Sequence, residues 1–177
     1  METTIKNNPL AALLAVPAVD RTRRNHGLEH ATLTVLAEKN RHIRLIGRST
    51  PAGFHIYGHV STQALLEAAT EALLRLQGGE ADLAVHPNCG TNFVIAGFAA
   101  AFAAYLGFVG ANRWRDRWER MPLVALLSTV AIIAAQPVAL AVQRDITTSG
   151  DARTLRISHI DRRETNGMVA HFVSTEG

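Results

Sequence analysis

The sequence predicts an α+β protein: a small α-β-β-α-β sandwich with an inserted two-helix transmembrane hairpin and a C-terminal β-hairpin. Three observations support this fold class. Helical and alternating apolar patterns follow one another over residues 22–92. Two uncharged apolar runs cover residues 93–111 and 123–142. Alternating segments return over residues 144–177, around an Asn-Gly turn.

The N-terminal segment, residues 1–21, contains the apolar stretch Leu10–Val19, which Pro17 interrupts. This stretch is too short to cross a bilayer, and it lacks the basic region and small-residue cleavage site of a signal peptide. An interfacial or packing segment and a disordered tail are equally consistent with it.

The first domain, residues 22–92, begins with a helix from Thr22 to about Asn40, where apolar residues recur at helical spacing. Two strands are expected next, at Ile43–Ile46 and Phe54–Val60, joined by a Gly/Ser/Pro-rich loop.

A second helix of this domain is expected after the cap residue Ser61 or Thr62, because an apolar stripe follows and Gly78-Gly79 ends it. A short strand at Asp82–Val85 completes the order helix, strand, strand, helix, strand.

The region 93–143 is expected to form the transmembrane hairpin, since each apolar run can cross about 30 Å of hydrocarbon. A buried soluble hairpin is the alternative. Between the runs lies an arginine-rich stretch with Trp114 and Trp118, which are expected at the membrane interface. These arginines could bind lipid phosphates or form a solvated loop. Small residues recur four apart, which lets helices pack closely: Gly97 with Ala101, and Ala131 with Ala135 and Ala139.

The C-terminal region, residues 144–177, contains two expected strands, Leu155–Ile160 and Met168–Ser174, joined around Asn166-Gly167. Because a lone β-hairpin is marginal in water, we expect these strands to join the sheet of residues 22–92.

Composition narrows the classes of function. The formal net charge of +3 is mild, and no Lys/Arg stripe with interleaved aromatics is present, so a nucleic-acid partner is not expected. The single cysteine, Cys89, excludes an internal disulfide. Cys89 is therefore a buried packing residue, a metal ligand or a nucleophile.

The segment His26-Gly27-Leu28-Glu29-His30 carries the strongest chemical signal. Residues four apart share a helix face, so His26 and His30 can bind one ion. Glu29 lies near enough to polarise a water on that ion, which is the pattern of the inverted zinc motif H-x-x-E-H. A surface helix that happens to carry these residues is the alternative.

The segment His86-Pro87-Asn88-Cys89-Gly90 follows far downstream. As a thiolate, Cys89 would be a third zinc ligand and leave the fourth position for water. His86 could be the third ligand instead, a partner of a bound group, or a turn histidine. The metal-ligand candidates are therefore His26, His30 and Cys89, and the candidate catalytic residues are Glu29 and His86.

These motifs resemble those of the S-ribosylhomocysteine lyase (LuxS) family, over about a third of the chain. His26–His30 corresponds to that family's H-T-x-E-H helix, Cys89-Gly90 to its C-G turn, and Ser49–Phe54 loosely to its Ser-Pro-x-Gly-Cys loop. The resemblance implies the fold shared with the pitrilysin/insulinase metallopeptidases, a zinc cofactor, Glu29 as acid/base and, by analogy, a homodimer.

Phe54 stands where the lyase has its second catalytic cysteine, and it cannot shuttle a proton, so the lyase reaction is not expected. His55 and His59 could replace that cysteine as proton carriers in the metal cleft, or they are half-exposed strand histidines. The chain also resembles uncharacterised bacterial membrane proteins that carry H-G-x-E-H, H-P-x-C-G-T and an apolar helix. That likeness names no substrate.

Two functions follow as expectations. The first is a membrane-anchored zinc-dependent hydrolase, such as a metallopeptidase, acting on a membrane-proximal protein or a lipid-linked substrate. The second is a non-catalytic zinc-stabilised subunit or assembly factor of a membrane complex, with His86 as a fourth ligand. We expect the protein to lie in the bacterial cytoplasmic membrane. The positive-inside rule would place the loop Arg113–Arg120 in the cytoplasm, whereas the absence of a signal peptide and a zinc thiolate favour a cytoplasmic soluble domain.

Overall fold

The computed structural model describes residues 8–165 and 167–177, and the chain divides into two units. The first unit comprises Met1–His86 and Arg144–Gly177, and the second comprises Pro87–Gln143. The first contains helices and one antiparallel sheet, and the second contains two apolar helices. The predicted α+β class is confirmed at this level.

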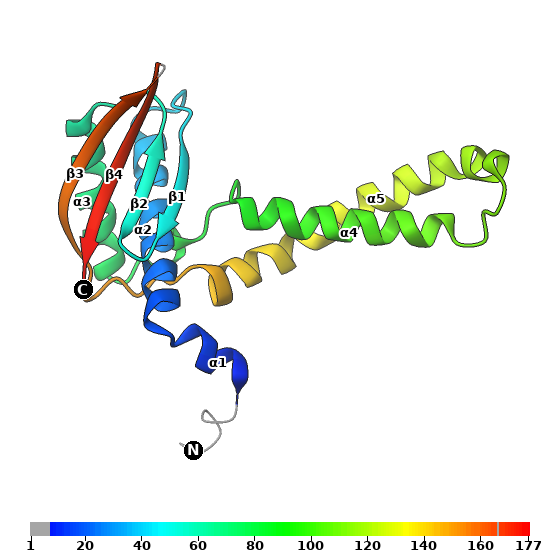
Figure 1. Cartoon of the computed structure of the whole chain (residues 1–177), viewed down its shortest axis with the longest axis horizontal. Coiled ribbons are helices and arrows are strands. Elements are labelled where there is room, and N and C mark those ends of the chain that lie inside the picture. The colour runs from blue at the N-terminus through cyan, green and yellow to red at the C-terminus, as the bar shows by residue number, and fades with distance from the viewer. Residues whose placement is uncertain (1–7, 166) are drawn as a thin grey trace. The chain divides into compact units, whose positions relative to one another are not determined.

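The sheet of the first unit has the strand order β1-β2-β4-β3, with every neighbouring pair antiparallel. Figure 1 shows α2 and α3 on one face of this sheet. The elements of this unit are α1 (Pro9–Leu14), α2 (Pro17–Lys39), β1 (Ile46–Thr50), β2 (Gly53–Tyr57), α3 (Thr62–Gln77), the 3-10 helix η2 (Ala81–Ala84), β3 (Arg156–Thr165) and β4 (Met168–Glu176). Because β4 pairs with β2, strands from both ends of the sequence complete a single sheet.

Alternation along the central strands separates a buried face from a half-exposed face. Phe54, Ile56 and Val173 are fully buried, in one apolar cluster with Leu28 and Val35 of α2. Each such side chain contributes about 1.5–3 kcal/mol on burial. This cluster fixes which face of α2 points to the sheet.

The first strand lies later than the sequence predicted. It was expected at Ile43–Ile46, but β1 is Ile46–Thr50, followed by a turn at Pro51-Ala52. This strand passes close to α2, since a Cβ built at Gly47 would overlap the carboxylate of Glu29, which would then have to move. The Gly/Ser composition that indicated a loop therefore reflects a close approach between β1 and α2.

The strand predicted at Asp82–Val85 is wrong, because this segment forms η2. Its backbone closes the hydrogen bonds Leu83 N to Glu80 O and Val85 N to Asp82 O, both 3.1 Å. These bonds use N–H groups that a strand would need for a ladder, and four residues suffice for one 3-10 turn. The last element of the expected α-β-β-α-β order is therefore helical.

The second unit consists of α4 (Gly90–Phe108) and α5 (Trp114–Val142), and the π-helical turn η3 (Gln143–Thr147) follows α5. Both helices are long and apolar enough to cross a membrane. The expected spans were 93–111 and 123–142, so both helices begin earlier than predicted. The arginine-rich stretch belongs to the first turns of α5 rather than to a loop.

α4 and α5 approach each other closely at Gly107. A Cβ added there would lie 2.7 Å from Cγ2 of Val124, whereas a Cβ at Gly97 would meet nothing within 4 Å among the described residues. Gly97 therefore does not mediate the close packing that its spacing suggested. Ala135 and Ala139 of the same pattern are buried.

Candidate metal centre

The two motif histidines lie one turn apart on α2, and their rings meet edge to face. The ring centroids of His26 and His30 are 4.3 Å apart. His30 is 3% exposed, and His26 is half-buried. Two imidazoles are therefore held side by side at the buried face of a helix.

Backbone carbonyls determine which nitrogen of each ring carries the proton. Nδ1 of His26 lies 2.9 Å from the carbonyl oxygen of Thr147, and Nδ1 of His30 lies 2.9 Å from that of Ala84. A carbonyl oxygen only accepts, so Nδ1 is the donor in both rings, and in the neutral ring Nε2 is then the acceptor nitrogen. This is the arrangement of metal-binding histidines, which donate their second N–H to a carbonyl or carboxylate.

Arg23, three residues before His26 on α2, binds the segment that carries Thr147. Its guanidinium donates to the carbonyl oxygens of Asp145, Ile146 and Thr148 at 2.9, 2.7 and 3.0 Å. These carbonyls lie in or directly after the π-helical turn η3, where the end of a helix presents carbonyl oxygens to side-chain donors. Arg23 therefore positions the residue that orients His26.

Glu29 is 4% exposed and points toward β1. The hydroxyl of Ser49 donates to Oε2 of Glu29. Gly47 and Ser49 both face α2 because they alternate with Arg48 along β1. A buried carboxylate one residue from His30 is thus held by a strand hydroxyl that the sequence did not identify as functional.

Cys89 follows His86 by three residues and directly precedes α4. The ring centroid of His86 lies 5.8 Å from that of His30, and three residues of chain reach at most about 10 Å. Ligand atoms of His26, His30 and Cys89 lie within 4.8 Å of one another. These three side chains form a group that could hold a metal ion.

His55 and His59 do not share a face toward α2. His55 lies on the sheet face opposite the helices, next to Tyr57 and Phe172, with ring centroids 5.9 and 4.6 Å away. Burial, and then the charges of Arg48 and Arg163, hold the pKa of His55 below its usual range. β2 ends at Tyr57, before Gly58 at a φ of 127°, so His59 lies in an exposed bend.

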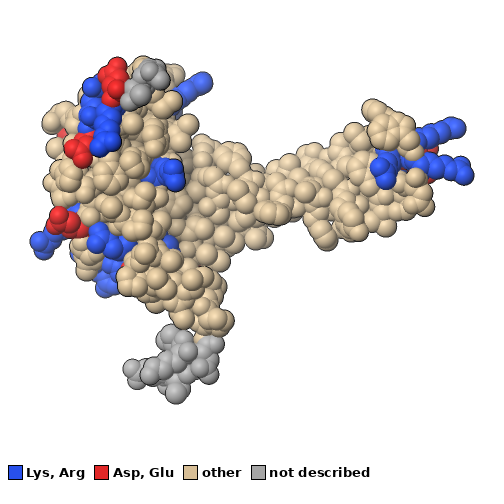
Figure 2. Space-filling view, in the orientation of Figure 1, with Lys and Arg blue, Asp and Glu red and all other residues tan. Residues whose placement is uncertain are grey.

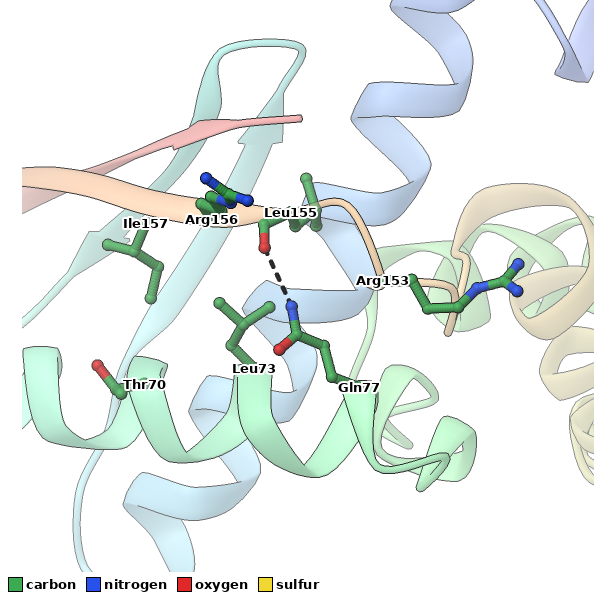
Figure 3. Close-up of a pocket in the computed structure, with 7 residues that line it drawn as sticks. All are labelled: Thr70, Leu73, Gln77, Arg153, Leu155, Arg156 and Ile157. Carbon is green, nitrogen blue, oxygen red and sulfur yellow. Dashed lines mark hydrogen bonds between the residues drawn. The ribbon is translucent and has the colours of Figure 1, made fainter.

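A separate pocket lies between α3 and the start of β3 (Figure 3). Gln77 crosses it and donates to the carbonyl oxygens of Ala152 and Leu155, both at 3.1 Å. Arg153 at its rim is paired with Asp151, whose pKa the guanidinium holds well below its usual range. These contacts anchor the returning chain to α3, and the lining contains no histidine, cysteine or carboxylate among the described residues.

Comparison with known proteins gives a family but no activity. Residues 21–160 match the family described as "Domain of unknown function (DUF6391)". An uncharacterised protein of Picosynechococcus sp. (strain ATCC 27264 / PCC 7002 / PR-6) is 29% identical, over 94% of this chain and 86% of its own length. No solved structure matches the chain. The matched range contains His26, His30, Cys89 and both apolar helices.

Proposed function

This chain belongs to the DUF6391 family, whose description assigns no activity, and we propose that it is a membrane-anchored zinc-dependent hydrolase, with the metallopeptidases as its nearest chemical parallel. The observation that carries the proposal is the pair of carbonyl-bound imidazoles. With Nδ1 of each ring on a backbone carbonyl, Nε2 is the ring nitrogen of His26 and of His30 that would bind a shared cation.

The donor set favours zinc among the common metal ions. Two imidazole nitrogens and the sulfur of Cys89 are borderline-soft ligands, whereas magnesium and calcium select oxygen. Catalytic zinc sites have three protein ligands and an open fourth position. When bound in such a site, zinc acts as a Lewis acid and lowers the pKa of water toward about 7.

Glu29 is the group in this site that would take a proton as water attacks a carbonyl carbon. Ser49 holds its side chain by the hydrogen bond to Oε2, so the carboxylate cannot turn freely. Gly47 leaves the space that the carboxylate occupies. Glu29, one residue before His30, is therefore held in position by Ser49 as the acid/base of this proposal.

The helical hairpin provides the membrane anchor in this proposal. In the view of Figure 2, no Lys, Arg, Asp or Glu side chain is visible along the sides of the hairpin. Large apolar side chains along it are exposed to solvent, such as Phe98 at 76% and Phe102 at 65%, which a lipid environment would cover. A membrane-proximal protein or a lipid-linked molecule is then the substrate class, and we place the soluble unit in the cytoplasm of a bacterium.

A non-catalytic zinc-stabilised subunit is the second candidate function, and the position of His86 favours it. Its ring lies 5.8 Å from that of His30, so a change of rotamer is what would bring its imidazole to the same ion as a fourth ligand. A site closed in this way binds metal without an open position for water. Variants of His86 separate the two candidates.

The first test measures zinc in detergent-purified protein by elemental analysis. We expect about one zinc per chain, lost in His30→Ala and Cys89→Ser and retained in Glu29→Gln and in the control His159→Ala. Hydrolysis of fluorescently labelled casein should stop in Glu29→Gln. The subunit would be favoured if the wild type contains zinc but hydrolyses neither casein nor membrane-protein substrates, and if His86→Ala loses the zinc. Absence of zinc after zinc is supplied would refute both.

A further inference from the structure

A cavity at the tip of the helical hairpin is not used by the proposed metal chemistry. Its volume is about 400 Å³, and it is lined by Phe108, Trp114, Arg117, Trp118 and Met121. The two indole rings pack edge to face with centroids 5.8 Å apart, and they are 71% and 60% exposed. The lining is therefore aromatic and apolar, with one guanidinium among it.

We propose that this cavity binds an anionic phospholipid, with the lipid phosphate on Arg117 and the glycerol and upper acyl chains on the aromatic lining. The inference rests on the proposed insertion of the hairpin in a membrane. Tryptophan side chains at the ends of apolar helices lie at the level of lipid headgroups. An anionic headgroup would then be at the height of the guanidinium.

The charges around the cavity complement an anion. Residues 109–121 contain four arginines and two acids, a net charge of +2. Both acids have local partners, since Glu119 pairs with Arg115 at 3.0 Å and Asp116 accepts from the backbone N–H of Arg113. Figure 2 shows Lys and Arg side chains gathered at this tip. The net positive charge of residues 109–121 therefore remains for an anionic ligand.

Arg117 is held in position before any lipid binds. Its Nε donates to the carbonyl oxygen of Ala111 at 3.3 Å, which leaves the terminal nitrogens for a ligand. Arg120 donates to the carbonyl oxygens of Gly107 and Val109 and so fixes the end of α4. A planar guanidinium donates two parallel hydrogen bonds to phosphate, which a positioned side chain forms with little loss of entropy.

The chain offers a direct optical probe, because Trp114 and Trp118 are its only tryptophans. The full chain is reconstituted in phosphatidylcholine vesicles that contain a small fraction of brominated lipid, which quenches nearby indoles. We expect brominated phosphatidylglycerol to quench at about a fivefold lower mole fraction than brominated phosphatidylcholine, the preference of one arginine at a membrane surface.

Variants assign this preference to the cavity. Arg117→Gln should abolish it, Arg117→Lys should retain most of it, and the control Arg153→Gln should leave it unchanged. Equal quenching by both lipids in the wild type, an unaltered preference in Arg117→Gln, or reversal by millimolar inorganic phosphate would overturn the lipid site. Absence of quenching by either lipid would also overturn membrane insertion, while the zinc measurement on the same sample would still decide the metal site.

Discussion

The chemistry at the residue scale depends on partners that lie far away in the sequence. His26 is oriented by Thr147, 121 residues later, and His30 by Ala84, 54 residues later. The H-x-x-E-H spacing predicted adjacent imidazoles because helix geometry alone dictates it. The tautomers were not predictable, since they depend on carbonyls that only the folded chain brings to Nδ1.

Ser49 provides the first prediction at this scale. Ser49→Ala removes the hydroxyl that donates to the buried Glu29 carboxylate. Leaving a buried charged group without such a partner costs about 1–3 kcal/mol, so the free energy of unfolding should fall by that amount. Urea unfolding followed by far-UV circular dichroism measures it. The control Ser158→Ala removes an exposed serine and should change the same quantity by less than about 0.5 kcal/mol. Equal effects of the two variants would mean that the hydroxyl does not support Glu29.

His171 provides a prediction about pH. Its ring is fully buried against Thr62, with Nε2 3.1 Å from Oγ1. Burial, and then the charge of Arg162, lower the pKa of His171 in the folded chain. The unfolded chain therefore binds more protons as the pH falls below about 6.5, and stability should decrease there.

Measurement of the free energy of unfolding between pH 8 and pH 5 tests this prediction. His171→Gln cannot take up a proton and should reduce the acid loss of stability, whereas the exposed-site control His42→Gln should follow the wild type. His55, whose pKa is also lowered, contributes with the same sign, so a partial reduction is the expected result. A His171→Gln curve parallel to that of the wild type would contradict the assignment.

At the scale of elements, capping signals predicted α3 well and composition predicted β1 poorly. Ser61 accepts a hydrogen bond from Ala64 N, and α3 runs from Thr62 to Gln77, just before the predicted glycine stop. These signals are local, so the sequence contains them in full. Gly47 in β1 lies instead against the side chain of Glu29, which belongs to α2. A local sequence pattern does not contain such a contact.

Gly107 carries the prediction for the helical hairpin. In Gly107→Ala the new methyl would lie 2.7 Å from Cγ2 of Val124, so the Val124 side chain or the two helices must shift. Overpacking of this kind costs about 1–3 kcal/mol. The control Gly97→Ala meets nothing among the described residues, and the helix propensity of alanine should stabilise it by up to about 1 kcal/mol. Unfolding in mixed micelles, followed by tryptophan fluorescence, should give opposite signs. Two changes of the same sign would show that the helices do not pack at Gly107.

At the scale of the whole molecule, the sequence predicted that the C-terminal β-hairpin joins the sheet, because an isolated β-hairpin is only marginally stable. β3 and β4 cannot bury a face alone, and β4 pairs with β2 over Gly53–Tyr57. An antiparallel sheet is thus completed by chain on either side of the two apolar helices. The sequence could not give the strand order, because β3 and β4 have similar patterns and only pairing distinguishes the edge strand from the central one.

The proposed insertion of both apolar helices in a membrane makes a prediction for the whole chain: residues 144–177 and the tip of the helical hairpin would lie on opposite sides of the bilayer. Single cysteines at the exposed positions Ser158→Cys and Arg113→Cys report the two sides. The wild type, whose only cysteine is the buried Cys89, gives the background.

A membrane-impermeant maleimide should label one variant in intact spheroplasts and the other only in inverted vesicles. Labelling of Arg113→Cys from outside would place the metal centre in the cytoplasm, as proposed, and labelling of Ser158→Cys from outside would reverse that orientation. Labelling of both from one side would show that the hairpin lies along the membrane surface without crossing it.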